Sequence, residues 1–227
     1  SSFDKIKEKF PRKSLLQINF PVILNHQYSK QDLINLRDKH NLEQGDFIIS
    51  SFGFVTPPKQ IPLILNSLSL IKKELKNIKY LIVGEVHESI NIKKLIKQYQ
   101  LNSIVKVIGY TDLLMFEEYI KLSDLIITLR YPSAGETSAV LLRALAYGKA
   151  NIVFDYDSFG DFADDILIKL PLNTFDPFSL AESIKTIYMN KDLKHSYEIN
   201  ARDYIRSHHD IEKISEQLTK HLTNSQH

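Results

Sequence analysis

The sequence predicts an α/β fold in which a doubly wound parallel sheet carries flanking helices on both faces. The first observation is that apolar runs such as 80–85 and 125–129 are short, rich in β-branched residues and without polar alternation. The second is that most of these runs end at a glycine or a polar loop, and the third is that a segment with helical spacing of apolar residues usually follows. Strands that alternate with helices in this way pair in parallel.

The individual elements are expected in the following order. Residues 15–24, interrupted by Pro21, predict a strand with a turn, and Ser29 is expected to begin a helix with Leu33 and Leu36 on one face. Further strands are expected at 47–52, 80–85, 104–110, 125–129, 151–154 and 166–170. Helices are expected at 61–71, 92–99, 113–121 and 139–146, and from 178 to about 222 with breaks near Asn190 and His208.

Composition is ordinary for a globular protein and excludes several functional classes. Of the 227 residues, 43% are hydrophobic and 25% charged, and the net charge of +2 indicates no strong field for nucleic acid. Cysteine is absent, so neither a disulfide nor a thiolate metal site is expected, which is compatible with a cytoplasmic location. We find no apolar run of membrane-spanning length and no signal peptide. Because the chain begins with Ser1, we expect it to be cut from a longer protein.

The segment 130–149 carries the strongest functional signal. It reads as the end of a strand, a polar loop broken by Pro132 and Gly135, and an apolar helix that ends at Gly148. In an open parallel sheet, ligands bind at such carboxyl ends of strands. The carboxylate of Glu136 is suited to sugar hydroxyls. The cations Arg130 and Arg143, and the helix start at Thr137 and Ser138, are suited to phosphate.

Two interpretations of this segment remain open at the level of the residues. Glu136 and Arg143 are seven residues apart, which places them on one face of a helix that includes both. Alternatively, Ser133 to Glu136 is a capping-box pattern, so Glu136 would cap the helix and Arg143 would lie on an exposed edge. The cluster as a whole favours a binding site.

A second loop has a similar shape. The strand at 47–52 is followed by Gly53 and Lys59 and then by a helix, an arrangement that accepts phosphate. A solvated lysine near a helix start is the alternative for Lys59.

The segment 135–149, GETSAVLLRALAYGK, resembles the signature helix of retaining GT-B glycosyltransferases of family four. This sequence differs from the family pattern of two glutamates eight positions apart, because Gly135 and Arg143 occupy those positions and Glu136 follows one place later. The loop from Gly53 to Lys59 resembles the family's Gly-Arg-x-x-x-x-Lys loop, with Phe54 at the arginine position. The resemblance covers about residues 11–222 and implies a Rossmann-like domain, the C-terminal half of a GT-B fold.

The resemblance implies a donor site that holds a nucleoside diphosphate sugar, with UDP favoured. Lys59 and Glu136 would be catalytic, and the loop at Gly109 and Tyr110 would meet the base. The implied nucleotide-sugar contacts are Gly53, Lys59, Gly109, Tyr110, Arg130, Gly135, Glu136, Thr137, Ser138 and Arg143. No cofactor and no metal are expected, because Asp155-Tyr156-Asp157 lies in a loop where the family carries a single aspartate.

The implied protein is the donor half of a glycosyltransferase that is inactive alone. Residues 1–13 would be the remnant of an N-terminal domain and linker, 14–208 the nucleotide-sugar-binding domain, and 209–227 a C-terminal helix and tail. A glycan or lipid-linked acceptor would bind through the missing N-terminal domain. Family frequency favours bacterial surface polysaccharide synthesis, such as that of lipopolysaccharide. A cytoplasmic enzyme at the inner face of the membrane, held there peripherally, is compatible with this role.

Two alternatives remain from the sequence. The first is a non-catalytic nucleotide-binding or protein-interaction module on the same fold, which the departures at Phe54, Gly135 and Arg143 keep open. The second is another GT-B reaction, such as sugar-nucleotide epimerisation or phosphorolysis. Phosphorolysis would need a pyridoxal lysine, and no segment indicates one.

Overall fold

One parallel sheet organises the chain. The computed structural model describes residues 2–11, 15–16, 18–24, 28–133, 138–173 and 175–224. Within them, six strands pair in parallel in the order β3-β2-β1-β4-β5-β6, so the predicted fold class is confirmed. The strands are β1 Phe47–Phe52, β2 Ile78–Val83, β3 Val105–Gly109, β4 Leu125–Ile127, β5 Ala150–Asp155 and β6 Ile168–Pro171. The chain order reverses between β1 and β4, which is where ligands bind in such sheets.

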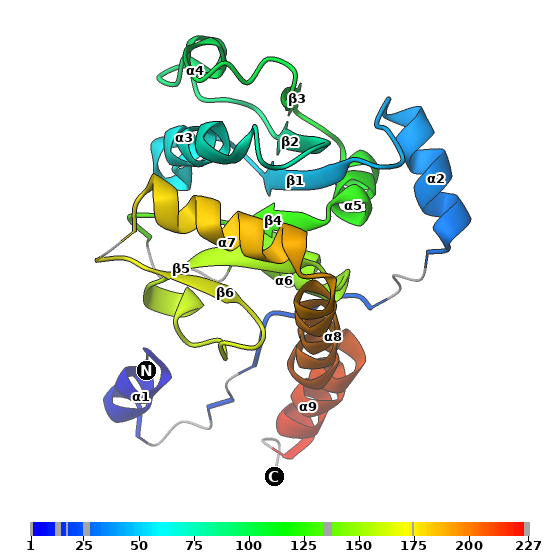
Figure 1. The fold of residues 1–227 in the computed structure, drawn as a ribbon. Helices are drawn as coiled ribbons and strands as arrows, with labels where there is room; N and C mark the ends of the chain where they lie inside the picture. Colours follow the sequence, from blue (N-terminus) through cyan, green and yellow to red (C-terminus); the bar gives the residue numbers. More distant parts are fainter. Residues whose placement is uncertain are drawn as a thin grey trace.

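Helices cover both faces of the sheet (Figure 1). On one face, α3 Ile61–Ile71, α4 Ile92–Gln98 and α7 Pro177–Met189 contribute to one hydrophobic cluster, whereas α5 Leu113–Leu122, α6 Ala139–Ala146 and α8 Lys191–His208 contribute to the clusters on the other face. The remaining α-helices are α1 Ser2–Lys9, α2 Lys30–Lys39 and α9 Ile211–Asn224, with short 3₁₀ turns η1 Pro57–Lys59 and η2 Asp157–Phe159. In Figure 1, α1 stands apart from the layers.

The central strands β1, β2, β4 and β5 are buried on both faces, which explains their largely apolar character, whereas the edge strands β3 and β6 are partly exposed. In β1, Ile49 packs into the cluster with α3 and α7, while Ile48 packs into the cluster with α5. Neighbouring residues in a strand point to opposite faces, so both must be apolar when helices cover both faces. The only polar residues of β1, Ser50 and Ser51, are buried and hydrogen-bonded, Ser51 Oγ donating to the Ile127 carbonyl at 2.9 Å.

The strand predicted at 15–24 is wrong for the described residues of that segment. They contribute a single parallel bridge, Val22 to Asp210, and Ile18, Phe20 and Ile23 are exposed. Pro21 cannot donate a backbone hydrogen bond, so a regular ladder is interrupted there. The segment crosses the junction of α8 and α9, where Val22 N donates to the His209 carbonyl at 2.7 Å.

The structure also decides where α6 begins. Helix α6 begins at Ala139, and Ser138 is its N-cap, accepting a bond from Leu141 N at 3.2 Å. Ser138 therefore lies before the first turn, and the capping-box pattern at Ser133, one of the two interpretations left open by the sequence, does not start this helix. The predicted breaks near Asn190 and His208 are confirmed.

His209, which follows α8, is buried, with its Nδ1 2.8 Å from the Phe20 carbonyl. Within the described ranges, no helix combines the length and apolar character required to cross a bilayer.

Candidate functional site

A small pocket lies where the strand order reverses. It has a volume of about 30 Å³ and collects residues from the carboxyl ends of β1 and β4, from η1 and from the start of α6. Its lining comprises Ser51, Phe52, Lys59, Ile127, Thr128, Leu129, Arg130, Ser138 and Val140. The structure thus brings Lys59 together with Arg130 and Ser138, which belong to a segment that begins 71 residues later, and the sequence placed all three at the donor site.

Glycine shapes the loop beside this pocket. Gly53 and Gly84, which follow β1 and β2, have φ values of +82° and +146°. A Cβ on Gly84 would collide with the Gly53 carbonyl, so the two loops approach more closely than side chains permit. A bridge between Val55 and Val86 continues the contact. The loop that leads to Lys59 is therefore held by main-chain contacts with its neighbour.

The side chain of Lys59 points back toward the end of β1. Its Nζ donates to the Phe52 carbonyl, and a Cβ on Gly53 would meet that Nζ at 2.8 Å. Burial, with a smaller contribution from the neighbouring Arg130 cation, lowers the pKa of Lys59 to about 8. The amine is therefore mostly protonated at pH 7 and becomes neutral one to two pH units above that.

One main-chain and one side-chain hydrogen bond tie the Lys59 loop to the Arg130 loop. Tyr131 N donates to the Pro58 carbonyl at 2.8 Å, and the Gln60 amide donates to the Tyr131 carbonyl at 2.9 Å. These bonds fix the two cations relative to each other. Like charges held close together repel, and an anion between them relieves that repulsion.

Arg143 lies beside a second cavity. Its Nη1 is 3.9 Å from Glu117 Oε1, and both residues line a cavity of about 270 Å³ together with Leu113 and Ala139. Ala139 and Val140, neighbours on α6, line the second and the first cavity respectively, so α6 separates the two. Sequence reasoning missed Glu117, because an acidic residue on an amphipathic helix carries no signal of the residue it will face.

The remaining predicted site residues divide into two groups. Gly109 ends β3 with a φ of +81°, and Tyr110 beyond it is 82% exposed, which leaves its ring available to a ligand. Gly135, Glu136 and Thr137 lie outside the described residues, so their predicted roles stay predictions.

Acidic side chains in the part of the chain that the structure describes form no group of three or more with histidine suited to a metal ion. Asp155 and Asp157, the aspartates of the Asp-x-Asp sequence, differ in setting: Asp155 Oδ1 lies 3.9 Å from Lys169 Nζ, whereas Asp157 begins η2. Lys169 also pairs with Asp164 at 3.0 Å, so the carboxylate of Asp155 faces a cation.

Solved structures with the same fold include several glycosyltransferases. HepE from Anabaena, solved in complex with UDP, has a TM-score of 0.79 and 16% identity over 90% of this chain and 56% of its own. WaaG, a glycosyltransferase involved in lipopolysaccharide biosynthesis, has a TM-score of 0.73 and 18% identity over 89% of this chain and 55% of its own. The chain therefore spans about half the length of these two proteins.

A third structure matches over nearly its whole length. It is the C-terminal domain of LpcC, a group 1 family glycosyl transferase from Francisella tularensis, with a TM-score of 0.71 and 16% identity over 84% of this chain and 99% of that one. Among curated proteins, no sequence matches significantly. The family described as glycosyl transferases, group 1, matches residues 33–204, which include every strand of the sheet. The chain belongs to the glycosyl transferases group 1 family.

Proposed function

We propose that this chain is the donor-binding half of a retaining, metal-independent glycosyltransferase of family four that uses a UDP-sugar. The observation that carries the proposal is that Lys59 and Arg130 line one pocket at the reversal of strand order. HepE, of the same fold, is solved with UDP and with UDP-glucose, which supports the choice of nucleotide.

The chemistry proposed for Lys59 and Arg130 is electrostatic. Cleavage of the bond between sugar and diphosphate leaves negative charge on the leaving oxygen, and fixed cations at that point stabilise the transition state. Among the described residues, Lys59 contacts a backbone carbonyl and no carboxylate, so its charge is positioned there without being neutralised. Arg130 supplies the second cation, in place of the arginine that the family carries at the position of Phe54.

Glu136 is proposed to contact hydroxyls of the donor sugar. The alternative role of Glu136 is to complete a capping box with Ser133 as the N-cap. The N-cap of α6 is Ser138, so that alternative is not favoured. We propose that Gly135, Thr137 and Ser138 present backbone and hydroxyl groups to the phosphates beside it. Arg143, in the second cavity with Glu117, would approach the nucleotide from the other side of α6, where the family carries its ribose-binding glutamate.

The acceptor is proposed to bind through an N-terminal domain that lies outside this chain. A glycan or lipid-linked acceptor, and a role in bacterial surface polysaccharide such as lipopolysaccharide, rest on the likeness of fold to WaaG. An enzyme that uses such an acceptor is proposed to act at the cytoplasmic face of the membrane.

Calorimetry of the chain with UDP, GDP and ADP, each with and without EDTA, tests the proposal. We expect UDP to bind most tightly, EDTA to have no effect, and the chain alone to transfer no sugar. If none of the three nucleotides binds, the chain is not a donor domain, and the alternative of an interaction module takes its place. Binding that EDTA abolishes would contradict metal independence.

A further inference from the structure

The amino end of the sheet holds a second charged cavity. Asp124 immediately precedes β4, and Thr128 follows it, so the two cavities lie at opposite ends of this strand. The amino-end cavity has a volume of about 220 Å³, which is room for several water molecules at about 30 Å³ each. Its lining is basic: Arg37, Lys121, Lys149, Lys194 and Arg202 face only two acidic residues, Asp124 and Glu198.

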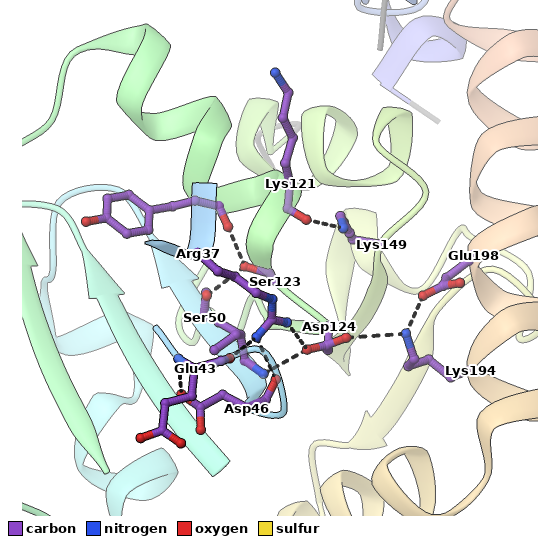
Figure 2. A network of polar contacts seen from close by, with 12 residues as sticks. Arg37, Glu43, Asp46, Ser50, Lys121, Ser123, Asp124, Lys149, Lys194 and Glu198 are labelled. Atoms are coloured by element: carbon purple, nitrogen blue, oxygen red, sulfur yellow. Dashed lines mark hydrogen bonds and ion pairs between the residues drawn. The ribbon is translucent and has the colours of Figure 1, made fainter. Parts of the chain in front are cut away.

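Part of this charge is balanced within the protein (Figure 2). Asp124 accepts from Ile48 N at 2.9 Å and pairs with Arg37 and Lys194, each at 3.6 Å. Glu198 takes a second, shorter contact from Lys194 at 2.6 Å. Arg37 also donates to the carbonyls of Glu43 and Asp46. Both carboxylates are therefore used by these two cations.

Two further cations lack a carboxylate partner among the described residues. Lys149 is only 7% exposed, yet its Nζ donates to the Lys121 carbonyl at 2.7 Å and lies 5.4 Å from the centre of the Tyr28 ring. In the part of the chain that the structure describes, the Arg202 guanidinium makes neither a hydrogen bond nor an ion pair. It lies against Gly148, where an added Cβ would collide with it.

A buried cation that contacts no carboxylate is costly, and although Asp124 and Glu198 offset part of the cost for Lys149 from a longer distance, an anion that enters lowers it further. Burial, the largest influence, lowers the pKa of Lys149 to about 8, so the amine is still mostly charged at neutral pH. An arginine fork and a lysine point charge are the two side chains that bind phosphate most often.

We infer that this cavity is a second anion site, in which Lys149 and Arg202 bind a phosphate or phosphomonoester group. The residues of this site share nothing with the pocket of Lys59 and Arg130, so the inference stands independently of the proposed function. The group could belong to a free phosphoester or to an anionic lipid headgroup, which present the same chemistry.

Titration of the ¹⁵N-labelled chain with inorganic phosphate at constant ionic strength tests the site, with backbone amide shifts as the readout. We expect saturable shifts at Gly148, Lys149 and Arg202, and separate ones at Gly53 if phosphate also enters the other pocket. Arg202→Gln should weaken phosphate binding at the amino end about tenfold or more, the loss of one charge-assisted hydrogen bond. Arg206→Gln is the matched control, because Arg206 lies one turn further on α8, is exposed, and pairs only with Asp203 in the described residues.

Glu198→Gln gives a change of opposite sign, since it removes a negative charge from the lining and should tighten phosphate binding. Co-sedimentation with vesicles of phosphatidic acid or phosphatidylcholine then separates the two sources. Binding to phosphatidic acid alone that Arg202→Gln abolishes identifies a lipid headgroup, and phosphate binding without vesicle binding identifies a soluble phosphoester. The inference is overturned if phosphate causes no saturable shift at the amino end, or if Arg202→Gln and Arg206→Gln bind phosphate equally.

Discussion

The Asp124 network at the amino end of the sheet and the Lys59 loop at the carboxyl end hold their cations in different ways. At the amino end, Arg37 and Lys194 contact the Asp124 carboxylate, and the network extends to Glu198. At the carboxyl end, Lys59 donates to a backbone carbonyl, and hydrogen bonds to main-chain carbonyls tie its loop to the neighbouring loops. Both arrangements fix a charge in space, but only the first neutralises it.

The difference indicates which charges stabilise the fold and which are available to a ligand. Cations that contact carboxylates gain their interaction energy in the free protein, and removing one partner costs stability. A cation held by a dipole is positioned while most of its charge remains uncompensated, so it interacts strongly with an anion that arrives. We therefore expect substitutions at the amino-end network to change stability and those at the carboxyl end to change binding.

The largest effect is expected at Asp124. Asp124→Ala removes a hydrogen-bond acceptor for Ile48 N and, among the described residues, leaves Arg37 without a carboxylate and Lys194 with Glu198 alone, so the free energy of unfolding should fall by about 2–3 kcal/mol. Urea denaturation measures this value. Asp203→Ala, in an exposed pair with Arg206, is the control and should change stability by less than about 1 kcal/mol. Equal losses would remove the distinction between the two kinds of charge.

The close approach of two loops predicts the next effect. Gly84→Ala places a Cβ against the Gly53 carbonyl at a φ that L-residues rarely adopt, and it should destabilise the protein by about 1–3 kcal/mol. Gly45→Ala is the control, since its Cβ would meet only Asn77 at ordinary contact distance, 3.8 Å. Thermal unfolding of both variants compares them. If Gly84→Ala is as stable as Gly45→Ala, the loop beside Lys59 is not held as described.

The charge on Lys59 predicts a pH dependence of binding. Its pKa of about 8 means that the free amine loses its proton as pH rises through that value. UDP affinity, measured relative to uridine to cancel ionisation of the base, should fall about tenfold from pH 7 to pH 9. The affinity ratio should be flat in the Lys59→Ala variant. If the ratio of UDP to uridine affinity does not change with pH in the unaltered protein, Lys59 does not bind the phosphates.

The smallest effect is expected at Tyr110, which is 82% exposed. If its ring packs on the base, Tyr110→Ala should weaken uridine and UDP equally, by about 0.5–1.5 kcal/mol, without changing the melting temperature. Calorimetry with both ligands measures the losses. If the affinity for both ligands is unchanged, the Tyr110 ring only covers its own loop and does not contact the base.

Much of the fold could be predicted because buried parallel strands and helices leave distinct periods in the sequence. The strands at 47–52 and 150–155 are buried on both faces, so most of their residues are apolar and each run stands out from the helices around it. The segment 15–24 was misread because its apolar residues alternate as in a strand, while no neighbouring strand is available to it among the described residues. Alternation reports side-chain pattern, but a strand also requires a hydrogen-bonding partner.

The candidate site was predictable only in part. Lys59, Arg130 and Ser138 belong to motifs at strand ends, and the sheet brings strand ends together. The partner of Arg143 is Glu117, from a different helix, and no local pattern encodes which helix faces will meet. The amino-end network depends likewise on Arg37, Asp124 and Lys194, which are far apart in the sequence.

The central claim is that Lys59 holds the diphosphate of a nucleotide, and a comparison of ligands tests it most directly. Lys59→Ala should weaken UDP binding by about 1.5–3 kcal/mol, the range for charge-assisted hydrogen bonds, and leave uridine binding unchanged. Lys106→Ala is the matched control, because Lys106 also donates to a backbone carbonyl, that of His40 at 2.9 Å, but lies near the start of β3 and should affect neither ligand. Calorimetry at pH 7 gives all six affinities. Equal losses for UDP and uridine in Lys59→Ala, or no loss for UDP, would contradict the account.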